Sequence, residues 1–333
     1  MDNFFFCYGR FNDEEQSEEN NMYSIEKLNL KKLTKRQRKA YHALLAPTWE
    51  SPYQPLKLLD PEEPKQIALA VLEYKRPVGL LVAKEILEKT WEIHSLFILE
   101  SHRRMHLASK LLKKLEKELF YKKVTSLVMM YKFAESPVID LFLNKNGWEG
   151  KRPILIECFF QDAKAFNPPW YTRNYPFPTH TEIFMWKDIK EAEIEELKRK
   201  CEQKLIPAGV DPFQGDASFD PNTSVGLRLK GEIVAWIITR LRPPSTLDFF
   251  AIYIDPAHQS KSYILHLLIK CTQLLQKEGV KSVFFFVNLI QSPMRWIRTI
   301  RKRLIPYASK VTLYEQAWKE LRKPIQKNSN LFK

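Results

Sequence analysis

Two stretches of the sequence decide the fold: EIHSLFILESHRRMHLA at Glu92–Ala108 and DFFAIYIDPAHQSKSYI at Asp248–Ile264. Each reads as an apolar strand, a short polar turn and the start of an amphipathic helix, and each is followed by a leucine pair, at 111–112 and 267–268. A helix that begins directly after a strand presents unsatisfied backbone N–H groups and the positive end of its dipole at the turn. Both stretches therefore predict a binding site for a pyrophosphate group.

The two stretches belong to a duplication. Shifting the sequence by 156 residues aligns positions 67–137 with 223–293 without a gap, and twelve of the 71 aligned pairs are identical. A gapless match of this length predicts duplication of a whole domain. The fold class that we expect is α/β, with two tandem domains, each a mixed, mostly antiparallel sheet flanked by helices.

Apolar periodicity gives the same order of elements in both halves: an early helix, three strands, a helix, a strand, a second helix and a last strand. In the first half these elements are expected at 33–45, 67–72, 78–83, 91–98, 103–120, 124–131, from 136, and 154–160. In the second half they are expected at 190–204, 225–229, 233–239, 247–254, 258–276, 280–287, 292–303 and 310–314.

Composition suggests the domain boundaries. Residues 1–21 hold six acids and a single base, which predicts a mobile acidic arm, and four prolines within 167–181 predict a linker without regular structure. We therefore expect domains at 22–166 and 182–322 and a basic tail at 323–333.

The charge balance favours anionic partners. Lys and Arg exceed Asp and Glu by 53 to 39, a net charge of +14, which suits a phosphorylated cofactor, a nucleic acid or an acidic substrate. The longest apolar runs have six residues, so we expect no membrane segment, and the N-terminus lacks a basic leader, so we expect a cytoplasmic protein. Four cysteines without a Cys-x-x-Cys pair predict neither a disulfide framework nor a metal site.

The two strand–turn–helix stretches resemble the GNAT superfamily of acyl-CoA-dependent N-acyltransferases. Its hallmark is a strand ending in Val-x-Pro, then (Arg/Gln)-x-x-Gly-x-(Gly/Ala), then two leucines. Arg103 and Gln259 occupy the opening position, Ala108 the closing one, and Ile254-Asp255-Pro256 supplies Val-x-Pro in the second half. The family's later signature, Asn-x-x-Ala…Tyr-x-x-x-Gly-Phe, is represented by Ser136 and by 143–148.

The resemblance implies acyl-CoA, most simply acetyl-CoA, as cosubstrate, with its pyrophosphate held by the turns and helix starts. The implied binding residues are Ile98, Arg103, Arg104, His106, Leu107 and Ala108 in the first half and Ile254, Gln259, Ser260, Lys261, Ser262 and Ile264 in the second.

This chain departs from the family pattern at several positions. The motif glycine is His106 in the first half and Ser262 in the second, and a side chain there crowds the phosphate site. The family's usual general-acid tyrosine falls on Leu143 and, by the same shift, on Thr299. One half is therefore a candidate for a vestigial site, and neither half is excluded as the working one.

Glu92 and Asp248 are the candidate bases. N-acyl transfer needs a neutral amine, and a carboxylate acting through water can take the proton. The two acids fall at equivalent positions of otherwise apolar strands, where the family often places this base. The alternative for each is an edge carboxylate in solvent or paired with Lys or Arg. Tyr131 is a candidate replacement acid, and His94 a helper to Glu92; packing is the alternative for both.

The expected function is acyl transfer from acyl-CoA to an amine by direct attack, because no Cys or Ser stands in a nucleophilic setting. The expected partner is an amine-bearing acceptor; nucleic acid is less favoured, and no membrane is expected. Two alternatives stay open: a Fem-type transferase that uses aminoacyl-tRNA, which the charge of +14 would suit, and a catalytically inactive CoA-binding or interaction module.

Overall fold

The computed structural model describes residues 22–45, 59–62, 65–162, 168–173, 175–177, 179–214, 219–242, 246–259 and 262–321. The predicted arm, the predicted tail and linker residues 167, 174 and 178 lie outside these ranges. Across the ranges just given, every helix is too short or too polar to cross a bilayer.

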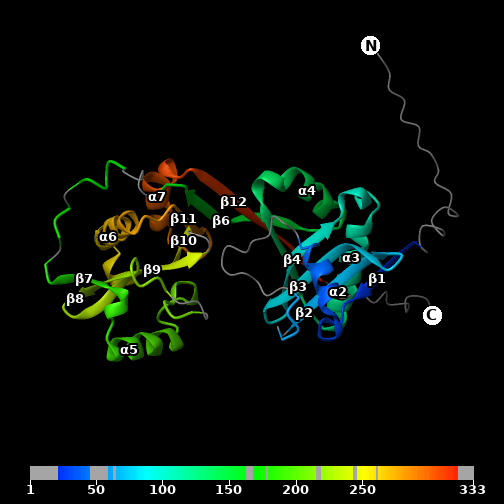
Figure 1. The fold of residues 1–333 in the computed structure, drawn as a ribbon, viewed down its shortest axis with the longest axis horizontal. Helices are drawn as coiled ribbons and strands as arrows, with labels where there is room; N and C mark the ends of the chain where they lie inside the picture. The colour runs from blue at the N-terminus through cyan, green and yellow to red at the C-terminus, as the bar shows by residue number, and fades with distance from the viewer. Residues whose placement is uncertain are drawn as a thin grey trace, which may run out of the picture. The chain divides into compact units, whose positions relative to one another are not determined.

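The chain forms two compact units (Figure 1). Unit 1 comprises residues up to Arg152 together with those from Glu315 onward, and unit 2 comprises Pro153–Tyr314. The predicted fold class is confirmed, since each unit contains a mostly antiparallel sheet with helices packed against it.

Unit 1 follows the expected order of elements. Its elements are β1 (Tyr23–Lys27), α2 (Lys35–His42), β2 (Gln66–Glu73), β3 (Arg76–Leu87), β4 (Thr90–Ile98), α3 (Leu107–Tyr121), β5 (Ser126–Lys132), α4 (Ser136–Lys145) and the start of β6 (Gly150–Phe160). The strands are ordered β1-β2-β3-β4-β5-β12. The β4–β5 pair is parallel, and the pairs from β1 to β4 are antiparallel.

Unit 2 repeats this order. Its elements are the rest of β6, then β7 (Thr181–Met185), α5 (Glu191–Glu202), β8 (Val225–Leu229), β9 (Glu232–Arg242), β10 (Thr246–Ile254), α6 (Tyr263–Lys277), β11 (Ser282–Asn288), α7 (Met294–Arg303) and the start of β12 (Lys310–Glu320). The strands are ordered β6-β11-β10-β9-β8-β7, and β10–β11 is the parallel pair.

Helices cover both faces of each sheet. In unit 1, the leucines of α3 and the α4 residue Leu143 pack with β2–β5 in one apolar cluster, and Tyr41 of α2 packs on the opposite face with Leu80 and Val82. In unit 2, α6 and α7 pack on one face and Leu197 of α5 on the other. Burial of these apolar faces stabilises both units.

The unit boundaries differ from those expected at 22–166 and 182–322. The last strand of each half of the sequence leaves its own unit: β6 begins in unit 1 and passes into unit 2 after Arg152, and β12 begins in unit 2 and continues in unit 1 from Glu315. Backbone hydrogen bonds hold both ends, from Glu149 N to Trp318 O (3.1 Å) in unit 1 and from Ser309 N to Phe159 O (2.8 Å) in unit 2. The proline-rich segment is therefore not the division between the units.

Two short strands, β1 and β7, were not expected from the sequence. Each has five residues and pairs on one side only, β1 with β2 and β7 with β8. Edge strands of this length carry few inward-facing residues, so their apolar alternation is too short to recognise.

Candidate functional site

A β-bulge interrupts the same strand in both units. In β4 the pairing with β3 shifts between Ile93 and Ser95, which leaves His94 as the extra residue. In β10 the pairing with β9 shifts between Phe249 and Ala251, which leaves Phe250 as the extra residue. The two bulge residues are 156 positions apart, so the duplication carried the bulge into both halves. A bulge leaves backbone groups outside the regular ladder and commonly lies beside an active site.

Beside each bulge the two parallel strands separate. The β4–β5 register ends at the pair Ile93 and Met129, although β4 continues to Ile98 and β5 to Lys132. The β10–β11 register likewise ends at Phe249 and Phe285. Each unit thus contains a split between parallel strands that opens directly at the bulge, and we call these gaps the unit 1 split and the unit 2 split.

The turn in front of α3 has left-handed backbone at two residues. Arg104 and His106 have φ values of 68° and 56°, in the left-handed region that favours glycine. Because of these residues α3 begins at Leu107 rather than at the expected Arg103. His106 makes no side-chain cap hydrogen bond, so it leaves the first-turn amides of α3 available to an anion.

Other predicted residues of this turn have structural contacts. The Arg103 side chain folds back on the strand, where Nε donates to Ile98 O (3.3 Å) and the guanidinium lies 5.8 Å from the Phe97 ring centroid. Leu107 is buried in the core, and Ala108 packs beside it. Of the six residues expected to hold the pyrophosphate here, Arg103, Arg104 and His106 are exposed at the turn, and the Arg103 side chain is held by the contacts just given.

His106→Gly is expected to raise the free energy of unfolding by about 0.5–1 kcal/mol, because a left-handed residue with a Cβ costs about 1–2 kcal/mol and glycine recovers part of this cost. Urea denaturation measures the change. Lys110→Gly, in the helical backbone of α3, is the matched control and should lower the same free energy by about 1 kcal/mol. Equal losses in both variants would show that His106 is not strained.

The corresponding turn of unit 2 is only partly described. Ser260 and Lys261 lie outside the described residues. Helix α6 begins at Tyr263 rather than at the expected His258, and Ser262 precedes it with an ordinary negative φ of −76°. The Ser262 hydroxyl lies 3.4 Å from His266 Nε2. Gln259 is in the helical region, and Ile254 and Ile264 pack against the unit 2 core.

Glu92 lies at the unit 1 split. It pairs with Val128 of β5 one register before the strands separate, and its side chain is 14% exposed. Burial raises its pKa to about 7. His94 Nε2 lies 3.8 Å from Glu92 Oε2; burial, and secondly the charge of Lys84, lower the pKa of His94 to about 4. A neutral imidazole therefore lies beside a carboxyl that titrates near neutrality.

Asp248 holds the equivalent place at the unit 2 split, where it is 5% exposed. In both units a cation faces the acid across the strand pair: Lys84 is in register with Glu92, and Arg240 with Asp248. Arg240 differs from Lys84 in that its guanidinium lies 3.1 Å from the ring centroid of the bulge residue Phe250 and donates to Gln214 O. The unit 2 bulge is therefore covered by a stacked side chain.

Tyr131, the candidate acid, is committed to other contacts. Its hydroxyl donates to Asp140 Oδ1 of α4 (3.0 Å), and burial, together with this carboxylate, raises the pKa of the phenol well above its usual range. Lys151 binds the other oxygen of Asp140 and lies 3.7 Å from Glu315 of β12. The structure places Tyr131 in a polar cluster of unit 1 that holds its proton firmly.

Sequence reasoning missed the bulges, although a signal for them exists. The core-facing residues of β4 change from odd to even positions, from Trp91 and Ile93 to Leu96 and Ile98. In β10 they change in the same way, from Leu247 and Phe249 to Ile252 and Ile254. A strand keeps its faces only if the alternation is unbroken, so this change of parity marks one extra residue.

Comparison with known proteins agrees with this geometry. The model of the Acetyltransferase (GNAT) family matches residues 30–142 and 179–293. No curated protein matches the sequence. A tandem GNAT protein from the clavulanic acid biosynthesis pathway has a similar structure, with a TM-score of 0.61, 13% identity, and coverage of 91% of this chain and 99% of that chain. A GCN5-related N-acetyltransferase from Sphaerobacter thermophilus is similar with a TM-score of 0.52, 13% identity, and coverage of 78% and 82%.

The structural likenesses show the fold, and the two family matches lie one in each half of the sequence and together span more than half of it. The chain therefore belongs to the Acetyltransferase (GNAT) family, as a tandem member with two GNAT domains.

Proposed function

We propose that this chain is an N-acyltransferase that moves an acyl group, acetyl in the simplest case, from acyl-CoA to an amine. The observation that carries the proposal is the unit 1 split, where separated parallel strands, a bulge and the buried carboxyl of Glu92 meet in one place. Family membership supports the reaction class.

The residues present in unit 1 fit acyl-CoA. The glycine-like backbone at Arg104 and His106 lets the amides at the start of α3 approach a pyrophosphate. When bound, acyl-CoA supplies an acyl group activated as a thioester. Glu92, with a pKa of about 7, takes a proton from the attacking amine directly or through water, and a backbone N–H at the His94 bulge polarises the carbonyl.

Unit 1 is the half to which we assign the chemistry. Its turn keeps the glycine-like backbone, and a neutral imidazole lies beside its carboxyl. In unit 2 the stack of Arg240 on Phe250 covers the bulge and takes the place of that imidazole. Asp248 is accordingly expected to contribute little to turnover.

Calorimetric titration with CoA and acetyl-CoA tests the proposal. We expect saturable binding and, at a ligand concentration of 100 Kd, a gain of about 2.7 kcal/mol in the free energy of unfolding. Ala108→Asp should weaken binding at unit 1 at least about tenfold, because it places a negative charge among the amides of α3. The same charge favours a helix N-terminus, which offsets part of the cost of placing it beside the core.

Tyr121→Asp is the matched control, since it adds the same charge at the other end of α3, where the side chain is 72% exposed. It should leave the Kd unchanged. No heat and no thermal shift at millimolar acetyl-CoA would overturn the proposed function.

A further inference from the structure

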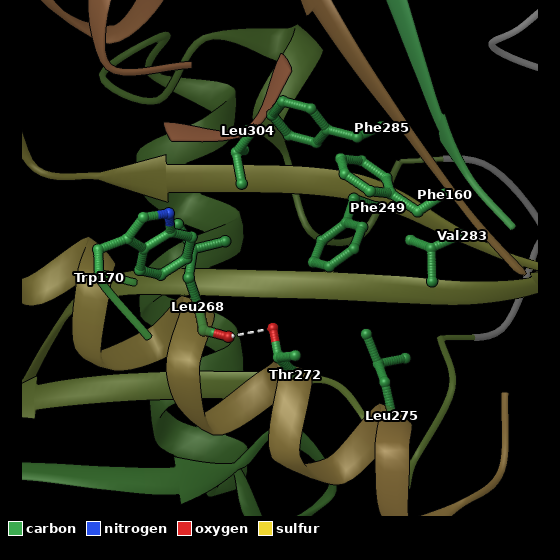
Figure 2. Close-up of a pocket in the computed structure, with 9 residues that line it drawn as sticks. All are labelled: Phe160, Trp170, Phe249, Leu268, Thr272, Leu275, Val283, Phe285 and Leu304. Atoms are coloured by element: carbon green, nitrogen blue, oxygen red, sulfur yellow. Dashed lines mark hydrogen bonds between the residues drawn. The ribbon is translucent and has the colours of Figure 1, made fainter. Parts of the chain in front are cut away.

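Unit 2 contains an apolar cavity of about 40 Å³ (Figure 2). In Figure 2 the rings of Phe160, Phe249 and Phe285 lie on one side of it and residues of α6 on the other, with Trp170 and Leu304 at one end. All of its lining residues belong to unit 2.

The polar atoms of the lining are satisfied elsewhere. Thr272 Oγ1 donates to Leu268 O (2.8 Å), and Trp170 Nε1 donates to Arg303 O (2.9 Å). Thr272 and Trp170 carry the only polar side-chain atoms among the lining residues. The cavity therefore offers a water molecule few partners, and it suits an apolar group.

The cavity lies at the vertex of the unit 2 split. Phe249 and Phe285 are the last residues in parallel register before β10 and β11 separate, and both rings line the cavity, with centroids 6.0 Å apart. A group held between the separated strands thus ends next to the cavity. The carbon atoms of such a group that extend furthest toward the vertex would enter the cavity.

The size of the cavity limits what it accepts. One water-sized group needs roughly 10–15 Å³ on this measure, so about 40 Å³ holds about three such groups. Three methylene-sized groups beyond an acetyl group correspond to an acyl chain of up to about five carbons.

We propose that unit 2 is a second acyl-thioester site, whose cavity selects short apolar acyl groups of three to five carbons over acetyl. This inference rests on the proposed function only in taking the acyl carrier to be CoA.

Calorimetric titration of the full chain with acetyl-, butyryl-, pentanoyl- and octanoyl-CoA tests the inference. Each methylene buried from water corresponds to about fourfold in affinity, so one class of sites should bind butyryl-CoA about 15-fold more tightly than acetyl-CoA. The gain should stop beyond pentanoyl, because octanoyl exceeds the cavity. A Kd independent of chain length at every site would overturn the inference while leaving the proposed function intact.

Leu304→Phe fills the cavity and should abolish the preference for butyryl at that class of sites while acetyl-CoA still binds. Leu205→Phe is the matched control, because Leu205 is 63% exposed in unit 2 and outside the cavity, and it should keep the full preference. A preference that survives in Leu304→Phe would also overturn the inference. If the wild-type chain binds none of the CoA thioesters, the proposed function is rejected, and the acyl-thioester site in unit 2 is rejected with it.

Discussion

Glu92→Gln is expected to lower kcat for acyl transfer by about 100-fold to 10,000-fold, with the Kd for acetyl-CoA changed less than about twofold. The substitution keeps the size of the side chain and removes the group that accepts the amine proton. A loss of about 100-fold to 10,000-fold in kcat is the usual range when a general base is removed. Steady-state assays of thiol release from acetyl-CoA with a panel of amines measure kcat, and calorimetry measures the Kd.

The pH dependence of the same reaction follows from the raised pKa of Glu92. Below a pH of about 7 the carboxyl is protonated and cannot accept a proton, so kcat at saturating amine should rise about tenfold per pH unit up to this value and then level off. His94, whose pKa is lowered to about 4, stays neutral throughout this range and adds no second step. Glu92→Gln should lose the step near pH 7 along with the rate.

Asp248→Asn is the control for this assignment. It makes the same change of charge at the equivalent position of unit 2 and should lower kcat less than about threefold. The opposite ranking, with Asp248→Asn the more damaged variant, would move the chemistry to unit 2.

The elements of the fold could be predicted from the sequence because their apolar periodicity is long and occurs twice. The helix with core residues Leu107, Leu111, Leu115 and Leu119 shows spacings of four throughout, and the structure buries each of them. The start of that helix could not be placed, because no residue type near 103–106 predicts left-handed backbone. The conformation of this turn depends on how the chain leaves β4.

The candidate site was predictable in part. Glu92 and Asp248 could be found because an acid in an apolar strand is costly, and they occupy equivalent positions of the splits. Three features of the site could not be predicted, because each depends on side chains brought together from different elements. They are the raised pKa of Glu92, the stack of Arg240 on Phe250 and the contact of Tyr131 with Asp140.

The domain boundaries depend on partners distant in the sequence. Proline content marks 167–181 as irregular, but it says nothing about which sheet receives the preceding strand. Strand β6 pairs with β11 from Leu155 to Phe160, and this pairing involves residues more than 120 positions away. Local patterns cannot report such a pairing, so the passage of β6 and β12 from one unit to the other emerges only from the structure.

Ala317→Asp is expected to destabilise unit 1 by about 3–5 kcal/mol, although most of that unit is formed by the first 152 residues of the chain. Ala317 of β12 is 2% exposed in the apolar cluster of unit 1, where a carboxylate would be buried without an assigned partner. The end of β12 is also anchored there, since Lys319 Nζ bonds to Glu116 Oε1 and to Asn146 O, both at 2.7 Å.

Hydrogen exchange localises this effect. Amides of β2–β5 should lose protection in Ala317→Asp, while those of β8–β10 keep it, because units with separate cores open separately. Val311→Asp gains the same charge on the same strand at a position that is 45% exposed in unit 2, and it should change stability by less than about 0.5 kcal/mol. Equal loss of protection in both units would contradict the division of β12 between them, since it would mean that the strand belongs to a single cooperative core.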